Sequence, residues 1–78
     1  MDIDQARTFL AITANGSFLE AARQLHLTQS TISARIQRLE DELGTRLFVR
    51  NRAGTSLTPA GRRFFDYAKR LVLTADQA

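Results

Sequence analysis

The chain has 78 residues, contains no cysteine and carries a net charge of +3. A chain of this length buries only about 60% of its unfolded surface, so we expect one small domain without an enclosed substrate cleft. The lack of cysteine excludes a disulfide framework and a thiolate zinc site. With 44% hydrophobic and 24% charged residues, the composition is that of a globular protein and not of a disordered segment.

The charged residues are unevenly distributed along the sequence. The windows 21–39 and 43–65 contain arginines but no acidic residue, and between them stand Glu40, Asp41 and Glu42. The position of the charges matters more than their total, because positive charge without neighbouring acids attracts a polyanion. A solvated basic surface is the alternative interpretation at this point.

Two helices are predicted in the N-terminal third of the chain. The apolar positions of the first, within residues 3–14, share one side of a helical wheel: Ile3, Ala6, Phe9, Leu10 and Thr13. Gly16 ends this helix, because glycine accepts the left-handed conformation. Ser17 and Glu20 then match a capping box that begins the second helix. Its expected inner face consists of Phe18, Ala21, Ala22 and Leu25.

A third helix is predicted between Thr28, a good cap, and Gly44, a good terminator. The connection to the second helix is so short that the two helices must cross at a steep angle. The apolar positions of the third helix form a narrow stripe: Ile32, Ile36, Leu39 and Leu43. Burying each of them contributes on the order of 1.5 to 3 kcal/mol, so the stripe determines which side of the helix faces the core.

The opposite side of the third helix carries small, hydroxyl, amide and guanidinium side chains. Ser30, Ser33, Ala34 and Gln37 lie on that side, with Thr31 and Arg38 on its flank and Gln29 near the N-terminal tip. In a DNA major groove, amides pair with adenine, arginine pairs with guanine, and methyl groups touch thymine. Phosphates would repel the acids at positions 40–42, so we expect the N-terminal half of the helix to enter the groove.

Those three acids also oppose the helix macrodipole, at a cost of about 0.3 to 1 kcal/mol each. We expect Arg38 or Arg46 to pair with at least one of them, and full solvation is the alternative. A metal site at the three acids is not expected, because adjacent residues on a helix point in different directions.

Residues 46–58 predict a small β-hairpin, since two short runs with β-branched and aromatic residues flank a turn that contains Asn51 and Gly54. We expect Arg50 and Arg52 at its tip. Guanidinium groups there would suit phosphates or the negative potential of a minor groove. An edge hairpin kept soluble by charge is the alternative.

A fourth helix is predicted from Thr58, its cap, with Pro59 at the first helical position. Its apolar stripe is broad: Ala60, Phe64, Phe65, Tyr67, Ala68, Leu71, Val72 and Ala75. This is more apolar surface than one small neighbour covers, so we expect the helix to pack on a second copy. The residues assigned to that contact are Phe64, Phe65, Ala68, Leu71, Val72 and Ala75. A terminal helix folded back on its own domain is the alternative.

The predicted fold is therefore mainly α with a small β-hairpin: a winged helix-turn-helix over residues 1–58, followed by a linker and dimerisation helix over residues 59–78. Five segments carry a family resemblance: residues 18–22 (FLEAA), 27–33 (LTQSTIS), 39–44 (LEDELG), 47–50 (LFVR) and 57–61 (LTPAG). Together they closely resemble the N-terminal DNA-binding domain of LysR-type bacterial transcriptional regulators. The likeness covers nearly the whole chain.

The resemblance implies sequence-specific binding of double-stranded DNA at imperfect inverted repeats near promoters, by a homodimer formed through the long last helix. It also implies a higher oligomer in the full-length protein and a separate C-terminal domain, absent from this chain, that binds a small-molecule effector. The DNA-contacting residues are then expected to be Thr28, Gln29, Ser30, Thr31, Ser33, Ala34, Arg35, Gln37, Arg38, Arg50 and Arg52. Ala34 departs from the family, in which many members carry arginine. A groove contact is then either lost or supplied by Arg35 or Gln37, so no base preference is carried over.

Two other classes of function fit the sequence less well. An enzyme lacks the necessary parts, since the only histidine, His26, falls in the turn between two helices and no glycine-rich phosphate loop is present. A winged helix used for protein interaction would present an apolar or acidic face where this chain has a polar, acid-free one. We expect no metal and no cofactor in this domain, no membrane partner, and a cytoplasmic location, since no apolar run approaches the roughly 20 residues of a membrane span.

Overall fold

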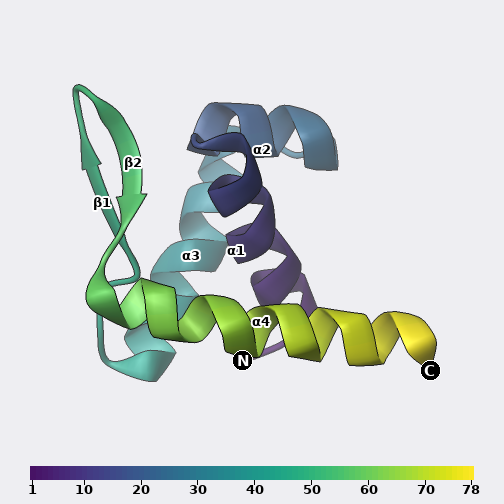
Figure 1. Cartoon of the computed structure of the whole chain (residues 1–78). Helices are drawn as coiled ribbons and strands as arrows, with labels where there is room; N and C mark the ends of the chain where they lie inside the picture. The colour runs from purple at the N-terminus through teal and green to yellow at the C-terminus, as the bar shows by residue number, and fades with distance from the viewer.

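The computed structural model describes all residues from 1 to 78. Its elements follow in the order α1 (Ile3–Asn15), α2 (Phe18–Leu25), α3 (Gln29–Leu43), β1 (Phe48–Asn51), β2 (Gly54–Leu57) and α4 (Pro59–Gln77). In Figure 1, α1 lies at the centre of the molecule, α4 runs across one side, and the hairpin rises from the start of α4. This architecture confirms the expected mainly α fold with a small β-hairpin. None of the helices combines the length and the apolar composition required to cross a membrane.

The helix starts are capped by side chains, although one capping box is not where it was expected. Ser17 accepts from the amide of Glu20 at 3.0 Å, but the Glu20 carboxylate pairs with Arg23 and does not reach back. A complete box instead begins α1, where Asp2 and Gln5 exchange backbone-to-side-chain hydrogen bonds of 2.8 and 2.9 Å. The arginine one turn further on competes for Glu20, which explains the half-formed box at Ser17.

The buried side of α1 is wider than its sequence pattern indicated. Besides the expected Ala6 and Phe9, the buried residues of α1 include Gln5, Thr8 and Ile12, which lie outside the predicted stripe. Leu10 and Thr13, which were expected in the core, are only half-buried. The reason is that α1 packs against α2, α3 and α4 at the same time. A single-face pattern underestimates the burial of a central helix.

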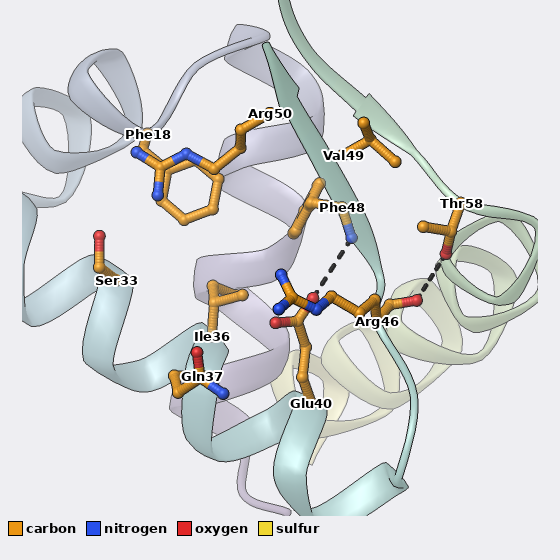
Figure 2. A pocket seen from close by; sticks show the side chains of 10 residues that line it. All are labelled: Phe18, Ser33, Ile36, Gln37, Glu40, Arg46, Phe48, Val49, Arg50 and Thr58. Atoms are coloured by element: carbon orange, nitrogen blue, oxygen red, sulfur yellow. Dashed lines mark hydrogen bonds between the residues drawn. The ribbon is translucent and has the colours of Figure 1, made fainter.

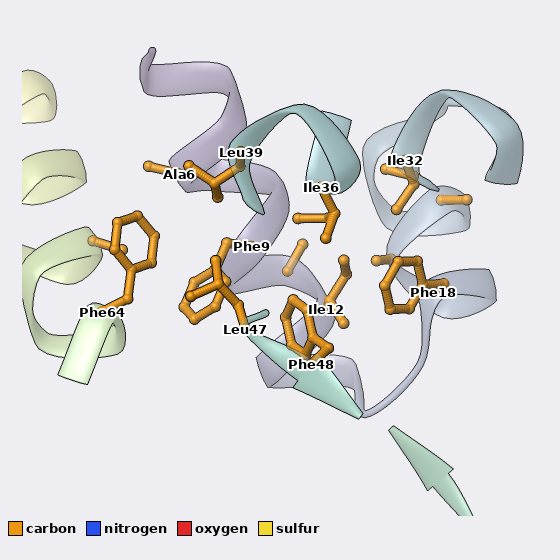
Figure 3. Packing of buried hydrophobic residues seen from close by; sticks show 14 residues of the cluster. Ala6, Phe9, Ile12, Phe18, Ile32, Ile36, Leu39, Leu47, Phe48 and Phe64 are labelled. Atoms are coloured by element: carbon orange, nitrogen blue, oxygen red, sulfur yellow. The ribbon is translucent and has the colours of Figure 1, made fainter. Parts of the chain in front are cut away.

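Four aromatic rings from four different elements meet in the core (Figure 3). The ring of Phe9 from α1 lies 5.1 Å from that of Phe48 in β1 and 4.9 Å from that of Phe64 in α4, measured between ring centroids. Phe18 from α2 lies 5.6 Å from Phe48. Such tilted and edge-to-face pairs contribute about 0.5 to 1.5 kcal/mol beyond the burial of their area. The hairpin is therefore joined to the helices by aromatic packing at its base.

The apolar stripe of α3 faces the core, with one exception. Ile32, Ile36 and Leu39 are buried, whereas Leu43 is 40% exposed. The expectation that Leu43 belongs to the buried stripe is wrong, because α3 ends at Gly44 and its last residue lies at the edge of the core.

The first half of α4 belongs to the core of its own chain. Phe64 and Ala68 are buried there, so the expectation that they contact a second copy has to be corrected: their side chains are already covered. Further along the helix, Leu71 and Val72 are half-buried and Ala75 is exposed. The distal part of α4, with the half-buried Phe65, is what remains available to a partner.

Candidate nucleic-acid interface

The N-terminus of α3 begins with an ordered group of hydroxyls. The Thr28 side chain accepts from the amide of Thr31 at 3.1 Å, and its oxygen lies 2.9 Å from the Thr31 hydroxyl and 3.2 Å from the Ser30 hydroxyl. The preceding His26 adopts the left-handed conformation with φ 57°, which ends α2 and turns the chain. These contacts confirm Thr28 as the cap and His26 as a turn residue. They present the amides and hydroxyls of the first turn to the exterior.

The polar face of α3, which comprises residues 28–31, 33, 34, 37 and 38, lies on the surface of the molecule. Its exposed members are Thr28, Gln29, Ser30, Ala34, Gln37 and Arg38, and its half-buried members are Thr31 and Ser33. Arg35 behaves differently, because its guanidinium donates to the Thr8 hydroxyl on α1 at 3.3 Å. Arg35 thus links α3 to α1 by a hydrogen bond, whereas the residues of the polar face lie at the surface.

An open groove of about 450 Å³ separates the polar face of α3 from the hairpin (Figure 2). Phe18, Ile36 and Phe48 form its apolar base, and Ser33 and Gln37 line the side of α3. The opposite side belongs to the hairpin. The groove is open to solvent and contains no cluster of potential metal ligands. The exposed helix and the projecting hairpin together form a surface that can fit around an elongated ligand.

The two hairpin arginines occupy different places. Arg50 lies within β1, opposite Thr55 of β2, and its guanidinium stands 3.9 Å from the centroid of the Phe18 ring. Only Arg52 is in the turn, where Asn51 accepts from the amide of Ala53 at 2.9 Å. The expectation that both arginines lie at the tip is therefore wrong for Arg50. The aromatic face of Phe18 holds its cation close to α2.

The three acids at the end of α3 have partners, but no arginine is among them. Glu40 accepts from the backbone amide of Leu47 at 2.7 Å. Asp41 accepts from Gln37 at 3.0 Å. Glu42 pairs with the amino group of Met1, and this contact and a hydrogen bond from Gln5 hold the pKa of the Glu42 carboxyl below its ordinary value. The expected pair with Arg38 or Arg46 is not formed, because successive acids on the helix point toward different neighbours.

A family model described as bacterial regulatory helix-turn-helix protein, lysR family, matches residues 3–62, which is most of the chain. The chain belongs to the LysR family. The regulator HdfR of Yersinia enterocolitica serotype O:8 is 46% identical over 74 residues, which cover 95% of this chain and 25% of that relative. HdfR of Yersinia pestis strain Pestoides F is equally similar. This LysR chain spans about a quarter of the length of the curated relatives it matches.

Solved structures of LysR regulators share this fold closely. The DNA-binding domain of CbnR in its DNA complex superimposes with a TM-score of 0.94 at 35% identity, over 99% of this chain and 88% of that one. The DNA-binding domain of BenM with catB site 1 DNA gives a TM-score of 0.94 at 38% identity, over 99% and 86% of the two chains. The winged helix-turn-helix fold is thereby confirmed.

Three structural residues of this LysR domain were missed in the sequence. Glu40 accepts a hydrogen bond from the backbone amide of Leu47, across the connection between α3 and the hairpin. The sequence around Glu40 gives no signal of that contact. Gln5 completes the capping box of α1, for which the spacing from Asp2 was the available signal. Gly61 lies in the first turn of α4, where glycine weakens a helix and thereby indicates a close approach by another part of the chain.

Proposed function

We propose that this chain binds double-stranded DNA in a sequence-specific manner as the DNA-binding domain of a LysR-type transcriptional regulator, with α3 in the major groove. The observation that carries the proposal is the exposed, acid-free polar face of α3 beside a hairpin that bears arginine. The DNA complexes of the CbnR and BenM domains, which share this fold, support it. A major groove is wide enough to admit one α-helix.

Residues at different positions on the polar face are expected to have different roles. Gln29, Ser33 and Gln37 would read base edges, because amides and hydroxyls distinguish bases by their donors and acceptors. The hydroxyls of Thr28, Ser30 and Thr31 stand at a helix N-terminus, which favours a phosphate. Two further members of the polar face have supporting roles: Ala34 would offer a methyl group to thymine, and Arg38 would place a cation on the flank.

The other assigned residues lie outside the polar face. Arg35 would contribute by linking α3 to α1. Arg50 and Arg52 of the hairpin would meet the adjacent DNA backbone or minor groove.

We further propose that the distal half of α4 forms a homodimer, so that two polar faces read an imperfect inverted repeat near a promoter. Leu71 and Val72 of the apolar stripe are half-buried there, with the half-buried Phe65 beside them. A second copy of α4 would cover this surface together with Ala75. The relatives are about four times as long as this chain, which supports a further domain in the full-length protein. We propose, on the family resemblance, that this domain binds a small-molecule effector and extends the oligomer. Such a regulator would act in the cytoplasm, where bacterial DNA is found.

The test is selection of this chain against a random duplex library at near-physiological salt, with the enriched sites read by sequencing. We expect a two-part inverted repeat to be enriched, and a Gln29→Ala variant to lose preference at one position of each half-site, at a cost of about 1 to 3 kcal/mol. Equal losses for Gln29→Ala on every duplex would refute base reading by this residue. Binding that lacks any enrichment and vanishes as salt rises would refute sequence specificity, and a protein-interaction module would then be the better interpretation.

Sedimentation equilibrium of the chain tests the dimer separately. We expect a concentration-dependent dimer that an Ala75→Glu variant abolishes, because a charge would have to be buried in the contact. A matched Gln77→Glu variant, on the opposite side of the helix, controls for added negative charge. A monomer at high concentration would overturn the proposed α4 contact for this domain.

A further inference from the structure

Glu40 makes an unusual contact between α3 and the hairpin. Its Oε2 atom accepts from the backbone amide of Leu47 at 2.7 Å and from that of Phe48 at 3.4 Å. Figure 2 shows the second of these hydrogen bonds. Glu40 itself is half-buried beside the groove. An acid in the last part of a helix opposes the helix macrodipole, so its presence there indicates a compensating role.

The two amides that Glu40 binds are the first two of the hairpin. Leu47 and Phe48 are 1% and 6% exposed, and Phe48 begins β1 opposite Leu57. Without the carboxylate, both buried amides would lose this acceptor, at a cost of about 1 to 3 kcal/mol for an unsatisfied buried group. Glu40 therefore fixes the place at which the hairpin starts.

On its other side, the base of the hairpin is held by Thr58, the N-cap of α4. The Thr58 hydroxyl donates to the carbonyl of Arg46 at 2.6 Å, and the Thr58 amide donates to the carbonyl of Leu47 at 3.0 Å. The connection from α3 contains Gly44 in the left-handed conformation with φ 70°. Apart from apolar packing, Glu40 is thus the link from the α3 side chains to the start of β1.

We propose that Glu40 is a positioning residue for DNA binding: it sets the separation of the polar face of α3 from the hairpin, and hence whether both meet DNA at once. This inference rests on the proposed DNA-binding function. Electrostatics alone predicts the opposite effect, because removing an acid from a DNA-binding domain reduces repulsion of phosphates. Whether removal of Glu40 weakens or strengthens DNA binding therefore distinguishes the positioning role from a purely electrostatic effect.

The test compares Glu40→Ala and Glu40→Gln with Glu42→Ala, a matched control that removes another acid of α3, whose side chain pairs with the Met1 amino group and Gln5 and not with the hairpin or the polar face. Each variant is titrated with the selected duplex, with and without Arg52→Ala. We expect Glu40→Ala to weaken binding by about tenfold, and Glu42→Ala to leave it unchanged or make it tighter. Glu40→Gln keeps one acceptor oxygen and should lie between Glu40→Ala and the parent chain. It also keeps the test possible if Glu40→Ala folds poorly.

The decisive readout is the factor by which Arg52→Ala weakens binding, measured in each background. Where Glu40 no longer positions the hairpin, Arg52 should contribute less, so this factor should shrink toward one in Glu40→Ala and remain as in the parent chain in Glu42→Ala. Hydrogen exchange measured without DNA should show faster exchange at the amides of Leu47 and Phe48 in Glu40→Ala, with the α1 amides unchanged.

Tighter binding by Glu40→Ala, an unchanged Arg52 factor, or unchanged exchange at the two amides would each overturn the positioning role. Failure of the proposed function is a separate result, because it would appear as a lack of duplex binding by the parent chain. The exchange measurement would still test the contact of Glu40 with the hairpin in that case.

Discussion

At the scale of single residues, Gly61 occupies a place in α4 that leaves no room for a side chain. A Cβ atom there would lie 2.2 Å from the carbonyl oxygen of Leu47 and 3.0 Å from Cδ2 of Leu57. The same Leu47 carbonyl accepts from the amide of Thr58. The backbone of α4 is thus pressed against the base of the hairpin, and one methyl group would separate them.

Gly61→Ala should therefore destabilise the domain by about 1 to 3 kcal/mol, as overpacking of a close contact does. This is opposite to the gain of about 0.8 to 1 kcal/mol that alanine gives over glycine in an ordinary helix. Urea unfolding followed by circular dichroism measures the difference. Thr74→Ala, at an exposed position of the same helix, should change the free energy of unfolding by less than about 0.5 kcal/mol. Stability equal to or above that of the parent chain for Gly61→Ala would contradict the close contact.

At the scale of elements, the hairpin carries two arginines with separate surroundings. Arg50 is stacked on Phe18 of α2, whereas Arg52 extends from the turn. A cation over an aromatic ring at an exposed site contributes about 0.5 to 1 kcal/mol. Arg50 consequently contributes to the docking of the hairpin on α2 even without DNA, and Arg52 does not.

Arg50→Ala should lower the free energy of unfolding by about 0.5 to 1 kcal/mol, and Arg52→Ala should leave it unchanged. Arg52→Ala should weaken binding to all duplexes alike and reduce the slope of log affinity against log salt by about one, as expected for one lost phosphate contact. Urea unfolding and titrations at several salt concentrations measure the two effects. If Arg50→Ala and Arg52→Ala lost the same amount of stability, the contact of Arg50 with Phe18 would contribute nothing. If Arg52→Ala left the salt slope unchanged, Arg52 would not contact the DNA backbone.

The boundaries of the elements could be predicted because they depend on neighbours in sequence. Thr28, Thr58, Gly16 and Gly44 begin or end the helices where their local chemistry indicates. The partners of the acids on α3 could not be predicted in this way. Glu40 meets Leu47 only because the connection turns back at Gly44, and that path is a property of the packed chain. The polar face of α3 was predicted from composition, but the inward direction of Arg35 depends on the position of α1.

At the scale of the whole molecule, an ion pair joins the beginning of the chain to its end. Arg7 on α1 binds Asp76 near the end of α4, and both groups are largely exposed. The hydrogen bond from Arg7 holds the pKa of the Asp76 carboxyl below its ordinary value. Because the folded pKa is depressed, the pair stabilises the folded state at neutral pH, and this contribution disappears as pH falls through the folded pKa.

Asp76→Asn should therefore reduce stability slightly at neutral pH, and the difference from the parent chain should vanish on acidification below the ordinary carboxyl range of about 4. High salt should also reduce the difference, since exposed pairs are screened. Thermal unfolding across pH and salt provides the measurement. Asp66→Asn removes an acid from the same helix without removing this pair and is the matched control. A difference between Asp76→Asn and the parent chain that persists in acid would rule out the ion pair as its cause.

The sequence did not determine how α4 divides its apolar surface. Phe64 and Ala68 share one stripe with Leu71 and Ala75, and the pattern alone does not say which of them meets α1 and which faces outward. That division depends on where α1 crosses α4, which is set by packing between segments far apart in the chain. The same limit applies to α1, whose burial on several sides comes from neighbours that no local pattern reveals.

The aromatic cluster at the centre of the fold has a consequence for the order in which the molecule is made. Phe9 leaves the ribosome early, but two of the rings that cover it, Phe48 and Phe64, come from the second half of the chain. Domains emerge from the ribosome with the N-terminal end first, so α3 with its polar face is synthesised before the core beneath it can close. The nascent chain therefore carries a surface chemically suited to nucleic acid before it has a rigid scaffold for that surface. Once the start of α4 has been made, Phe64 can pack on Phe9 and complete the core that supports the polar face of α3.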